Sequence, residues 1–400
     1  MMTTVVVVVL GAFAAAPERF RAIGVNHLGP WFLDLYAILA SNDALARGLD
    51  PYVYNPLDVF GRPHAYSHWW LKLGEFGLTR GDVLWLGAAL GGAFLIATLA
   101  WLRPRQPGEV IWSLLVLLSP PMLLALNRAN NDLVIFVLLA PVVPCLLSAR
   151  LWVQSLAVPL LVGAVALKSY PAIALAILLS VTAPRARRRL VFGAALALLI
   201  MLPDHIRDLG VYVKKVPEVE GLMTFGARHL WVGLDLPATW ARIGGAMVGA
   251  VAFAFWWRRD LLKGWEAGER AAWMGFVLGA LLLTGCFFAG VSYAYRWVFA
   301  LWLAPLLWRL PRDHAAPVAA RRLAGVTAAL LLWALWGDAA ASSVIGRVMA
   351  GASPERILEV ADRFSYMEQP LIWALVFCLL AFLAHFAREV WARLRSGAAN

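Results

Sequence analysis

Long apolar runs separated by short polar segments form the main pattern along this chain. Twelve runs occur, at 2–16, 82–102, 109–126, 132–148, 151–167, 170–183, 190–203, 237–257, 271–289, 295–308, 323–345 and 371–387. A helix of about 20 apolar residues crosses the hydrocarbon core of a bilayer, and tilted or partial spans need fewer. The pattern therefore predicts an all-α polytopic membrane protein of one domain, 1–400, with about twelve transmembrane helices. We expect the first run to be an uncleaved helix.

The composition excludes most soluble folds. Hydrophobic residues make up 62% of the 400 positions and charged residues 15%, against about 45–50% and about 25% in soluble domains. Lipid can cover this apolar surface, whereas water would cause the protein to aggregate. The three cysteines lie in apolar runs, so we expect neither disulfides nor a thiolate metal site. No cofactor is expected.

Gly-x-x-x-Gly pairs at 87/91, 245/249 and 275/279 predict close packing inside the bundle.

The net charge of +11 would suggest a nucleic-acid partner in a soluble protein. Here, basic residues are concentrated in short connections such as 185–189 and 321–322. The positive-inside rule then places both termini in the cytoplasm and the long segments 17–81, 204–236 and 346–370 outside. Long loops usually carry function. We therefore expect a periplasmic or luminal active site, with the bacterial cytoplasmic (inner) membrane as the first expectation, and no nucleic-acid partner.

The first outer segment carries an acidic residue in a predicted helix. Its apolar positions repeat with helical spacing at Phe32, Leu35, Tyr36 and Leu39. This repeat predicts an amphipathic helix at the membrane surface, with an Asp43–Arg47 pair and an end at Gly48. Asp34 then lies in the first turn. It either stabilises the helix dipole or acts as a general base.

Polar residues also interrupt the apolar runs at three places. The segment Asn127-Arg128-Ala129-Asn130-Asn131-Asp132 joins two predicted helices, either as a capped turn or as a cluster that contacts a polar head group. Lys168 lies between two apolar runs, in Lys168-Ser169-Tyr170-Pro171. The Lys168 side chain either extends so that its ammonium reaches the membrane–water interface, or it has a function, as charged residues inside a membrane usually do. Arg296 is either an interfacial anchor or an anion contact.

These residues suit a substrate that arrives through the lipid. The chain has no nucleotide-binding loop, nucleophile elbow or zinc-protease motif. An outward carboxylate and outward cations fit a group carried on a lipid phosphate. The candidate phosphate contacts are Lys168, Arg296, Arg128 and Tyr170. The candidate contacts of the transferred group or the acceptor are Tyr36, Tyr52, Tyr66, His68, Asn127, Asn130, Asn131, Asp132, Arg228 and His229.

Four motifs in this order resemble those of the GT-C superfamily, and most closely glycosyltransferase family 87, the polyprenol-phosphate-mannose-dependent mannosyltransferases. They are Asp34-Leu35-Tyr36, Gly48-x-Asp50-Pro51-Tyr52, the Asn-rich turn 127–132, and Lys168-x-Tyr170-Pro171. The resemblance implies inverting transfer of a hexose, with mannose as the first expectation, from a polyprenyl-phosphate donor to a glycolipid or envelope glycan. It also implies that Asp34 is the base and that no metal is needed. Where the family often has Tyr-Pro-Pro, this chain has Tyr66-Ser67-His68, which leaves the sugar and the acceptor open.

Two other functions remain open at this point. A transporter or flippase for a lipid-linked or small polar solute suits about twelve helices, but transporters place polar sites near the midplane between repeated halves. This chain has no visible repeat, and its polar residues gather on one predicted face. A non-catalytic scaffold for envelope assembly would tolerate neutral substitution of Asp34, Lys168 and Arg296.

Overall fold

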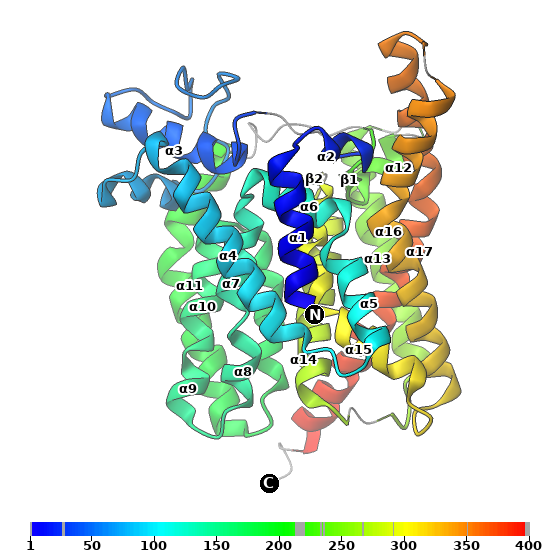
Figure 1. Cartoon of the computed structure of the whole chain (residues 1–400). Coiled ribbons are helices and arrows are strands. Elements are labelled where there is room, and N and C mark those ends of the chain that lie inside the picture. The colour runs from blue at the N-terminus through cyan, green and yellow to red at the C-terminus, as the bar shows by residue number, and fades with distance from the viewer. Residues whose placement is uncertain are drawn as a thin grey trace. The chain divides into compact units, whose positions relative to one another are not determined.

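The computed structural model describes residues 2–25, 29–212, 221–232, 234, 237–265, 268–290, 292–349 and 351–396. This part of the chain is mostly helical (Figure 1). The strands β1 (Thr224–Phe225) and β2 (Ser292–Tyr293) form one short antiparallel pair. The expected all-α class is therefore confirmed at the level of secondary structure.

Five helices within the described residues are long and apolar enough to cross a membrane. They are α4 (Val83–Leu102), α11 (Pro184–Tyr212), α14 (Arg270–Ala289), α16 (Val318–Val348) and α17 (Pro354–Ser396). A bent pair, α5 (Pro107–Leu117) and α6 (Pro120–Arg128), adds a sixth candidate with a bend of 54°. The protein is therefore an integral membrane protein. Helix length supports five or six spans, so the expectation of about twelve is not confirmed.

The other apolar runs form shorter helices. They comprise α1 (Met2–Ala15), α7 (Asn131–Leu139), α8 (Val142–Leu147), α9 (Leu151–Ser155), α10 (Ala157–Leu167), η3 (Tyr170–Ser180), α13 (Ala238–Arg258), η5 (Ala294–Trp302) and α15 (Ala304–Arg309). Prolines stand at or next to several of the breaks, including Pro120, Pro141, Pro171 and Pro305. Proline lacks the backbone N–H that a continuous helix needs, which explains why hydropathy alone overestimates helix length.

The polar connections contain short elements of their own. These are α2 (Arg19–Ala22), α3 (Leu33–Ala46), η1 (His68–Phe76), η2 (Arg80–Asp82), α12 (Arg228–Val232) and η6 (Leu310–Arg312). The segments 204–236 and 346–370, expected as loops, are partly helical. Residues 204–212 continue α11, and α17 begins at Pro354. Residues 213–220 of the first segment lie outside the described part.

The chain divides into two compact units. Unit 1 comprises 1–27, 101–123 and 218–400, and unit 2 comprises 28–100 and 124–217. In unit 1, α14 is buried along most of its length and packs against η5 and α17, while α16 and α17 pack side by side (Figure 1). Gly279 of α14 allows this packing, because a Cβ atom there would lie 2.8 Å from the Phe299 carbonyl oxygen. The predicted role of that glycine pair is confirmed.

In unit 2, α10 packs against α7, α8, α11 and η3, and α3 packs against η1. Figure 1 shows α3 at the opposite end of this unit from α8 and α9. The predicted amphipathic character of α3 is wrong. Leu35 and Leu39 pack on Val83 and Ala129 in a protein core, but the polar residues Ser41 and Asn42 of the same helix are buried as well. Helix α3 ends at Ala46, and Gly48 adopts the positive φ of 76° expected after a helix end.

The predicted pairing of Asp43 with Arg47 is wrong. The Asp43 carboxylate accepts a hydrogen bond from Arg80 Nε at 2.7 Å, whereas Arg47 is exposed at the helix end. Helix spacing indicates which residues are neighbours within α3, but it gives no information about a cation 37 positions away along the chain.

Candidate functional site

Asp34 lies in the first turn of α3, where the helix N-terminus favours a carboxylate. The helix starts after Phe32, whose backbone N–H donates to the Asn127 carbonyl oxygen at 3.0 Å. The Phe32 ring lies against Gly87 of α4, where a Cβ atom would come within 2.3 Å of it. These contacts fix the start of α3. They hold Asp34, which is only 5% exposed, in one place.

Asn130 connects Asp34 to α7. Its side-chain oxygen accepts from the Asp132 backbone N–H at 2.9 Å and caps α7, while its Nδ2 donates to Asp34 Oδ2 at 2.5 Å. The capped turn, one of the two alternatives, is therefore confirmed, whereas contact with a polar head group stays a prediction. In the described part of the chain, Asp34 Oδ1 has no hydrogen-bond donor, so this oxygen remains available to a ligand.

Lys168 lies at the predicted break between α10 and η3, which the structure confirms. Its Nζ forms an ion pair with Asp132 Oδ1, and the Tyr170 hydroxyl donates to the same oxygen at 2.7 Å. The rings of Tyr66 and Tyr170 lie 5.9 and 5.7 Å from Nζ. The Lys168 and Asp132 side chains are 10% and 0% exposed. Their opposite charges therefore compensate each other in a buried position.

We refer to Asp34, Asn130, Asp132, Lys168 and Tyr170 as the Asp34 cluster. Three separate stretches of unit 2 supply its members, and the cap at Asn130 joins the Asp34 side to the Lys168 side. Its neighbours Asn127, Arg128 and Asn131 are also buried. The side-chain amide of Asn131 has no hydrogen-bond partner among the described residues. Buried amides are normally hydrogen bonded, so Asn131 is another candidate contact for a polar ligand.

The loop 50–67 folds back toward this cluster. The Tyr36 hydroxyl donates to the Leu57 carbonyl oxygen at 3.4 Å, and the Tyr52 hydroxyl donates to the Tyr66 carbonyl oxygen at 3.3 Å. Asp50 accepts from the Tyr52 backbone N–H at 2.9 Å, as expected for a turn. The three predicted tyrosines are therefore linked by one loop, and the Tyr66 ring reaches Lys168.

This loop also holds an arginine, Arg62, that was not among the residues predicted from the sequence. Arg62 donates from Nε and Nη2 to the two oxygens of Asp58, at 2.9 and 2.8 Å. Asp58 also accepts from the backbone N–H groups of Phe60 and Arg62. Burial raises the pKa of Asp58, but its contacts with Arg62 and Phe60 outweigh burial and hold the pKa below its usual value. The spacing of four residues around Gly61 was a local signal for this pair.

His68 is held by a partner that the sequence did not indicate. Asp208 of α11 contacts His68 Nδ1 at 2.9 Å and accepts from the Ser67 hydroxyl at 2.6 Å. These residues are about 140 positions apart, so local spacing could not identify Asp208. The His68 ring also contacts Trp69, with the ring centres 5.1 Å apart. His68 is thus placed at the start of η1.

The remaining predicted residues, Arg228, His229 and Arg296, belong to unit 1. His229 contacts the Ser365 hydroxyl at 3.0 Å and stacks on Tyr366. Burial lowers the pKa of His229 to about 4, which keeps it neutral at pH 7. Arg296 lies in η5, directly after the β1–β2 pair. Each unit therefore holds its own set of the predicted polar residues.

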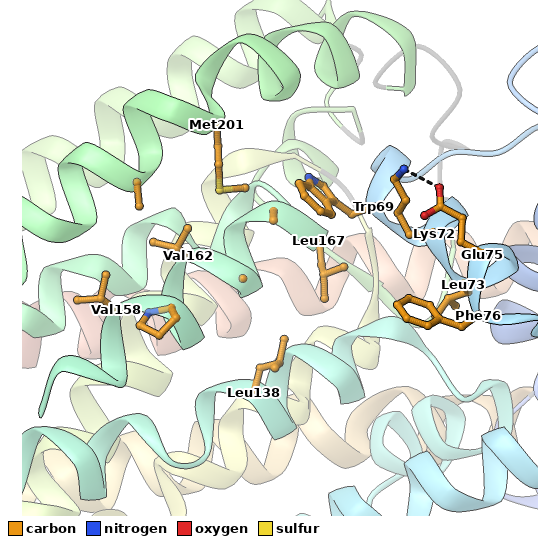
Figure 2. A pocket seen from close by; sticks show the side chains of 14 residues that line it. Trp69, Lys72, Leu73, Glu75, Phe76, Leu138, Val158, Val162, Leu167 and Met201 are labelled. Carbon is orange, nitrogen blue, oxygen red and sulfur yellow. Dashed lines mark hydrogen bonds and ion pairs between the residues drawn. The ribbon is translucent and has the colours of Figure 1, made fainter. Parts of the chain in front are cut away.

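An apolar cavity of about 860 Å³ lies within unit 2, between η1 and helices α7, α10 and α11 (Figure 2). Its wall on α10 extends from Val158 to Leu167, a length of about 14 Å at 1.5 Å per residue. Leu167 directly precedes Lys168, and its carbonyl oxygen accepts from Trp70 Nε1 at 3.1 Å. The apolar wall therefore ends one residue before the Asp34 cluster. Figure 2 also shows the Lys72–Glu75 ion pair on the η1 side.

A scan against models of known protein families gives no match, and a search of the curated proteins finds no relative. A functional assignment for this chain therefore depends on its own residues and their arrangement.

Proposed function

We propose that the protein is an inverting glycosyltransferase that moves a hexose, with mannose as the first candidate, from a polyprenyl-phosphate donor to a glycolipid or envelope glycan. The reaction would take place on the periplasmic face of the bacterial cytoplasmic membrane. The observation that carries the proposal is the position of Asp34. It is a buried carboxylate with one oxygen held by Asn130 and the other open among the described residues.

In the proposed step, Asp34 Oδ1 accepts the proton of an acceptor hydroxyl as that oxygen attacks the anomeric carbon of the donor. The new carbon–oxygen bond forms on the face opposite the phosphate. The bond between the anomeric carbon and the phosphate oxygen breaks, and polyprenyl phosphate leaves with the electron pair. A single displacement inverts the anomeric configuration and needs no enzyme nucleophile. Asn130 orients the base through its 2.5 Å hydrogen bond.

The apolar cavity supports a lipid-linked donor. A polyprenyl chain needs an apolar surface, and its phosphate needs polar groups where that surface ends. The wall of α10 has this order, because Leu167 lines the cavity and Lys168 follows it in the Asp34 cluster. Tyr66 and Tyr170 beside Lys168 add aromatic faces and hydroxyl groups of the kind that contact sugars.

The central test is the variant Asp34→Asn. Asparagine keeps the size of the side chain and can still accept a hydrogen bond from Asn130, but it cannot take up the proton. We expect transfer of labelled mannose from polyprenyl-phosphate mannose to membrane extract to fall at least about 100-fold, within the usual range for loss of a general base. The matched control is Asp82→Asn, because Asp82 is a capping acid outside the Asp34 cluster.

Thermal unfolding in detergent checks that both variants are folded. Near-normal transfer by folded Asp34→Asn would exclude Asp34 as the base. Uptake of a solute into proteoliposomes by the wild type, without a covalent product, would instead favour a transporter. Mass spectrometry of glycolipids and envelope glycans from a deletion strain would identify the acceptor.

A further inference from the structure

Arg62 is held by its neighbours in a way that leaves part of its guanidinium available. The Asp58 side chain is fully buried and is fixed by two backbone N–H groups as well as by Arg62. The two-point contact with Asp58 uses Nε and Nη2 and sets the plane of the guanidinium. Nη1 donates to no residue in the described part of the chain. The Arg62 side chain remains 36% exposed.

The position of Arg62 along its loop brings it toward the Asp34 cluster. The segment from Leu57 to Tyr66 is tied at one end to Tyr36, two residues after Asp34 on α3. At the other end, the Tyr66 ring lies 5.9 Å from Lys168 Nζ. Arg62 lies between these two attachments along the loop, and both ends of the loop therefore contact residues next to or within the Asp34 cluster.

The electrostatics of Arg62 agree with this position. Burial lowers the pKa of Arg62, but Asp58 outweighs burial, and the charges of Asp34 and Tyr66 raise the pKa further. Arg62 therefore senses the charge on Asp34 although it is bound to a different carboxylate.

Arg62 provides a more exposed positive charge for a ligand than the Asp34 cluster does. The Lys168 ammonium is only 10% exposed and is already paired with Asp132. A leaving phosphate gains negative charge during transfer, and it is stabilised best by donors that are already oriented. An arginine can contact a carboxylate along one edge and a phosphate with its remaining N–H groups, because it has five donors in one plane.

We propose that Arg62, oriented by Asp58, binds the phosphate group of the lipid carrier through its Nη1 edge. The identity of the carrier rests on the proposed function, whereas the binding itself can be tested without transfer. The phosphate is that of a polyprenyl phosphate, with its chain in apolar surroundings. The same guanidinium chemistry could recognise free phosphate, so the experiment includes both sources.

The experiment measures binding of undecaprenyl phosphate, undecaprenol and inorganic phosphate to the purified full chain in nanodiscs. We expect the wild type to bind undecaprenyl phosphate at least about tenfold more tightly than undecaprenol, and Arg62→Gln to abolish this preference. Arg47→Gln is the matched control, because Arg47 is an exposed arginine of the same unit at the end of α3. It should keep the full preference.

Arg62→Gln leaves the buried Asp58 carboxylate unpaired, so the double variant Asp58→Asn/Arg62→Gln is measured as well. Removing both charges avoids an unpaired buried ion, and this variant should also lose the preference for the phosphate. An unchanged preference in either folded variant would overturn the proposal. Arg62-dependent binding of inorganic phosphate without binding of undecaprenyl phosphate would overturn the lipid assignment. Asp34→Asn should bind the lipid phosphate at least as well as the wild type, which separates this inference from the test of the base.

Discussion

At the scale of single residues, the pair of Lys168 and Asp132 has the clearest energetic consequence. Both side chains are almost fully buried, and removal of one partner from a buried ion pair costs about 3–5 kcal/mol. We expect Lys168→Met to lower the stability of unit 2 by about this amount. The double variant Lys168→Met/Asp132→Asn should recover more than half of the loss, because it leaves no unpaired charge. Thermal unfolding in detergent measures both effects.

The exposed pair of Lys72 and Glu75 provides the control for this comparison. Its side chains are 48% and 64% exposed, and such surface pairs contribute about 0–1 kcal/mol. Lys72→Met should therefore have a small effect. If Lys168→Met were as mild as Lys72→Met, Lys168 would not be buried as the structure places it. If the double variant were as unstable as the single one, the ion pair would not be the source of the loss.

His64 gives a prediction about pH. Burial lowers its pKa to about 4, although its hydrogen bond to the Ser67 carbonyl oxygen acts in the opposite direction. The unfolded chain, with an ordinary histidine pKa near 6.5, binds this proton more tightly than the folded chain does. Neutral His64 therefore contributes up to about 3 kcal/mol to the free energy of unfolding. This contribution is fully present above about pH 6.5 and is lost as the pH falls toward 4. The unfolding midpoint measured from pH 7.5 to 4.5 should show this slope.

The dependence of the unfolding midpoint on pH should become weaker in His64→Gln. It should stay unchanged in His314→Gln, because His314 is exposed. A protonated His64 would also place a second N–H donor in the interior, where its Nδ1 has no partner among the described residues. An identical slope in wild type and His64→Gln would show that the acid sensitivity arises at other groups.

Individual residues also show how far the sequence could predict the site. The break at Lys168 and the turn before Asp132 were visible, because polar residues are conspicuous inside apolar runs. The contact between the two was not predicted, since they are 36 positions apart. Asp208 is 141 positions from Ser67 and gave no local signal. Spacing reports contacts within one helix or turn, whereas the packing of helices brings distant positions together.

At the scale of elements, the start of α3 depends on a glycine in α4, Gly87, which has no side chain to displace its neighbour. Phe32 packs onto Gly87 so closely that a Cβ atom there would be 2.3 Å from its ring. We expect Gly87→Ala to displace Phe32 and cost about 1–3 kcal/mol through overpacking. The proposed transferase activity should fall as well, because Asp34 is two residues after Phe32. Thermal unfolding and the transfer assay together measure the effect.

Gly92 of the same helix is the control, because a Cβ atom there meets nothing within 4 Å. Gly92→Ala should be neutral or stabilising, since alanine favours helix by up to about 1 kcal/mol over glycine. If the two substitutions had equal effects, the contact of Phe32 with Gly87 of α4 would not position the start of α3. The sequence predicted the role of such glycines only in general terms, as sites of close packing.

The same scale explains why twelve apolar runs gave only five or six long helices. A hydropathy pattern registers apolar side chains, but it does not register where the backbone hydrogen bonds stop. The run at 109–126 is divided between α5 and α6 with a bend of 54°, and Pro120 opens the second half. The runs at 132–148 and 151–167 are each divided into two shorter helices. Such breaks within a membrane are tolerated where neighbouring protein satisfies the backbone.

At the scale of the whole molecule, the basic residues predict an orientation in the membrane. Within unit 1, α16 begins with Arg321 and Arg322, and α17 ends with Arg393 and Arg395. These two helices run antiparallel over a short connection, so the basic residues lie at the same end of the hairpin. Within unit 2, α11 begins with the basic stretch 185–189. The positive-inside rule predicts that all of these ends lie in the cytoplasm.

Labelling of introduced cysteines tests this orientation. We expect Asp50→Cys and Glu355→Cys to react with a membrane-impermeant maleimide in intact spheroplasts, and Arg188→Cys and Arg322→Cys to react only after permeabilisation. All four positions are exposed. The wild type is the background control, since Cys145 and Cys286 are buried and Cys378 is half-buried. Labelling of Arg188→Cys from outside would place the Asp34 cluster on the cytoplasmic side, where a periplasmic acceptor could not reach it.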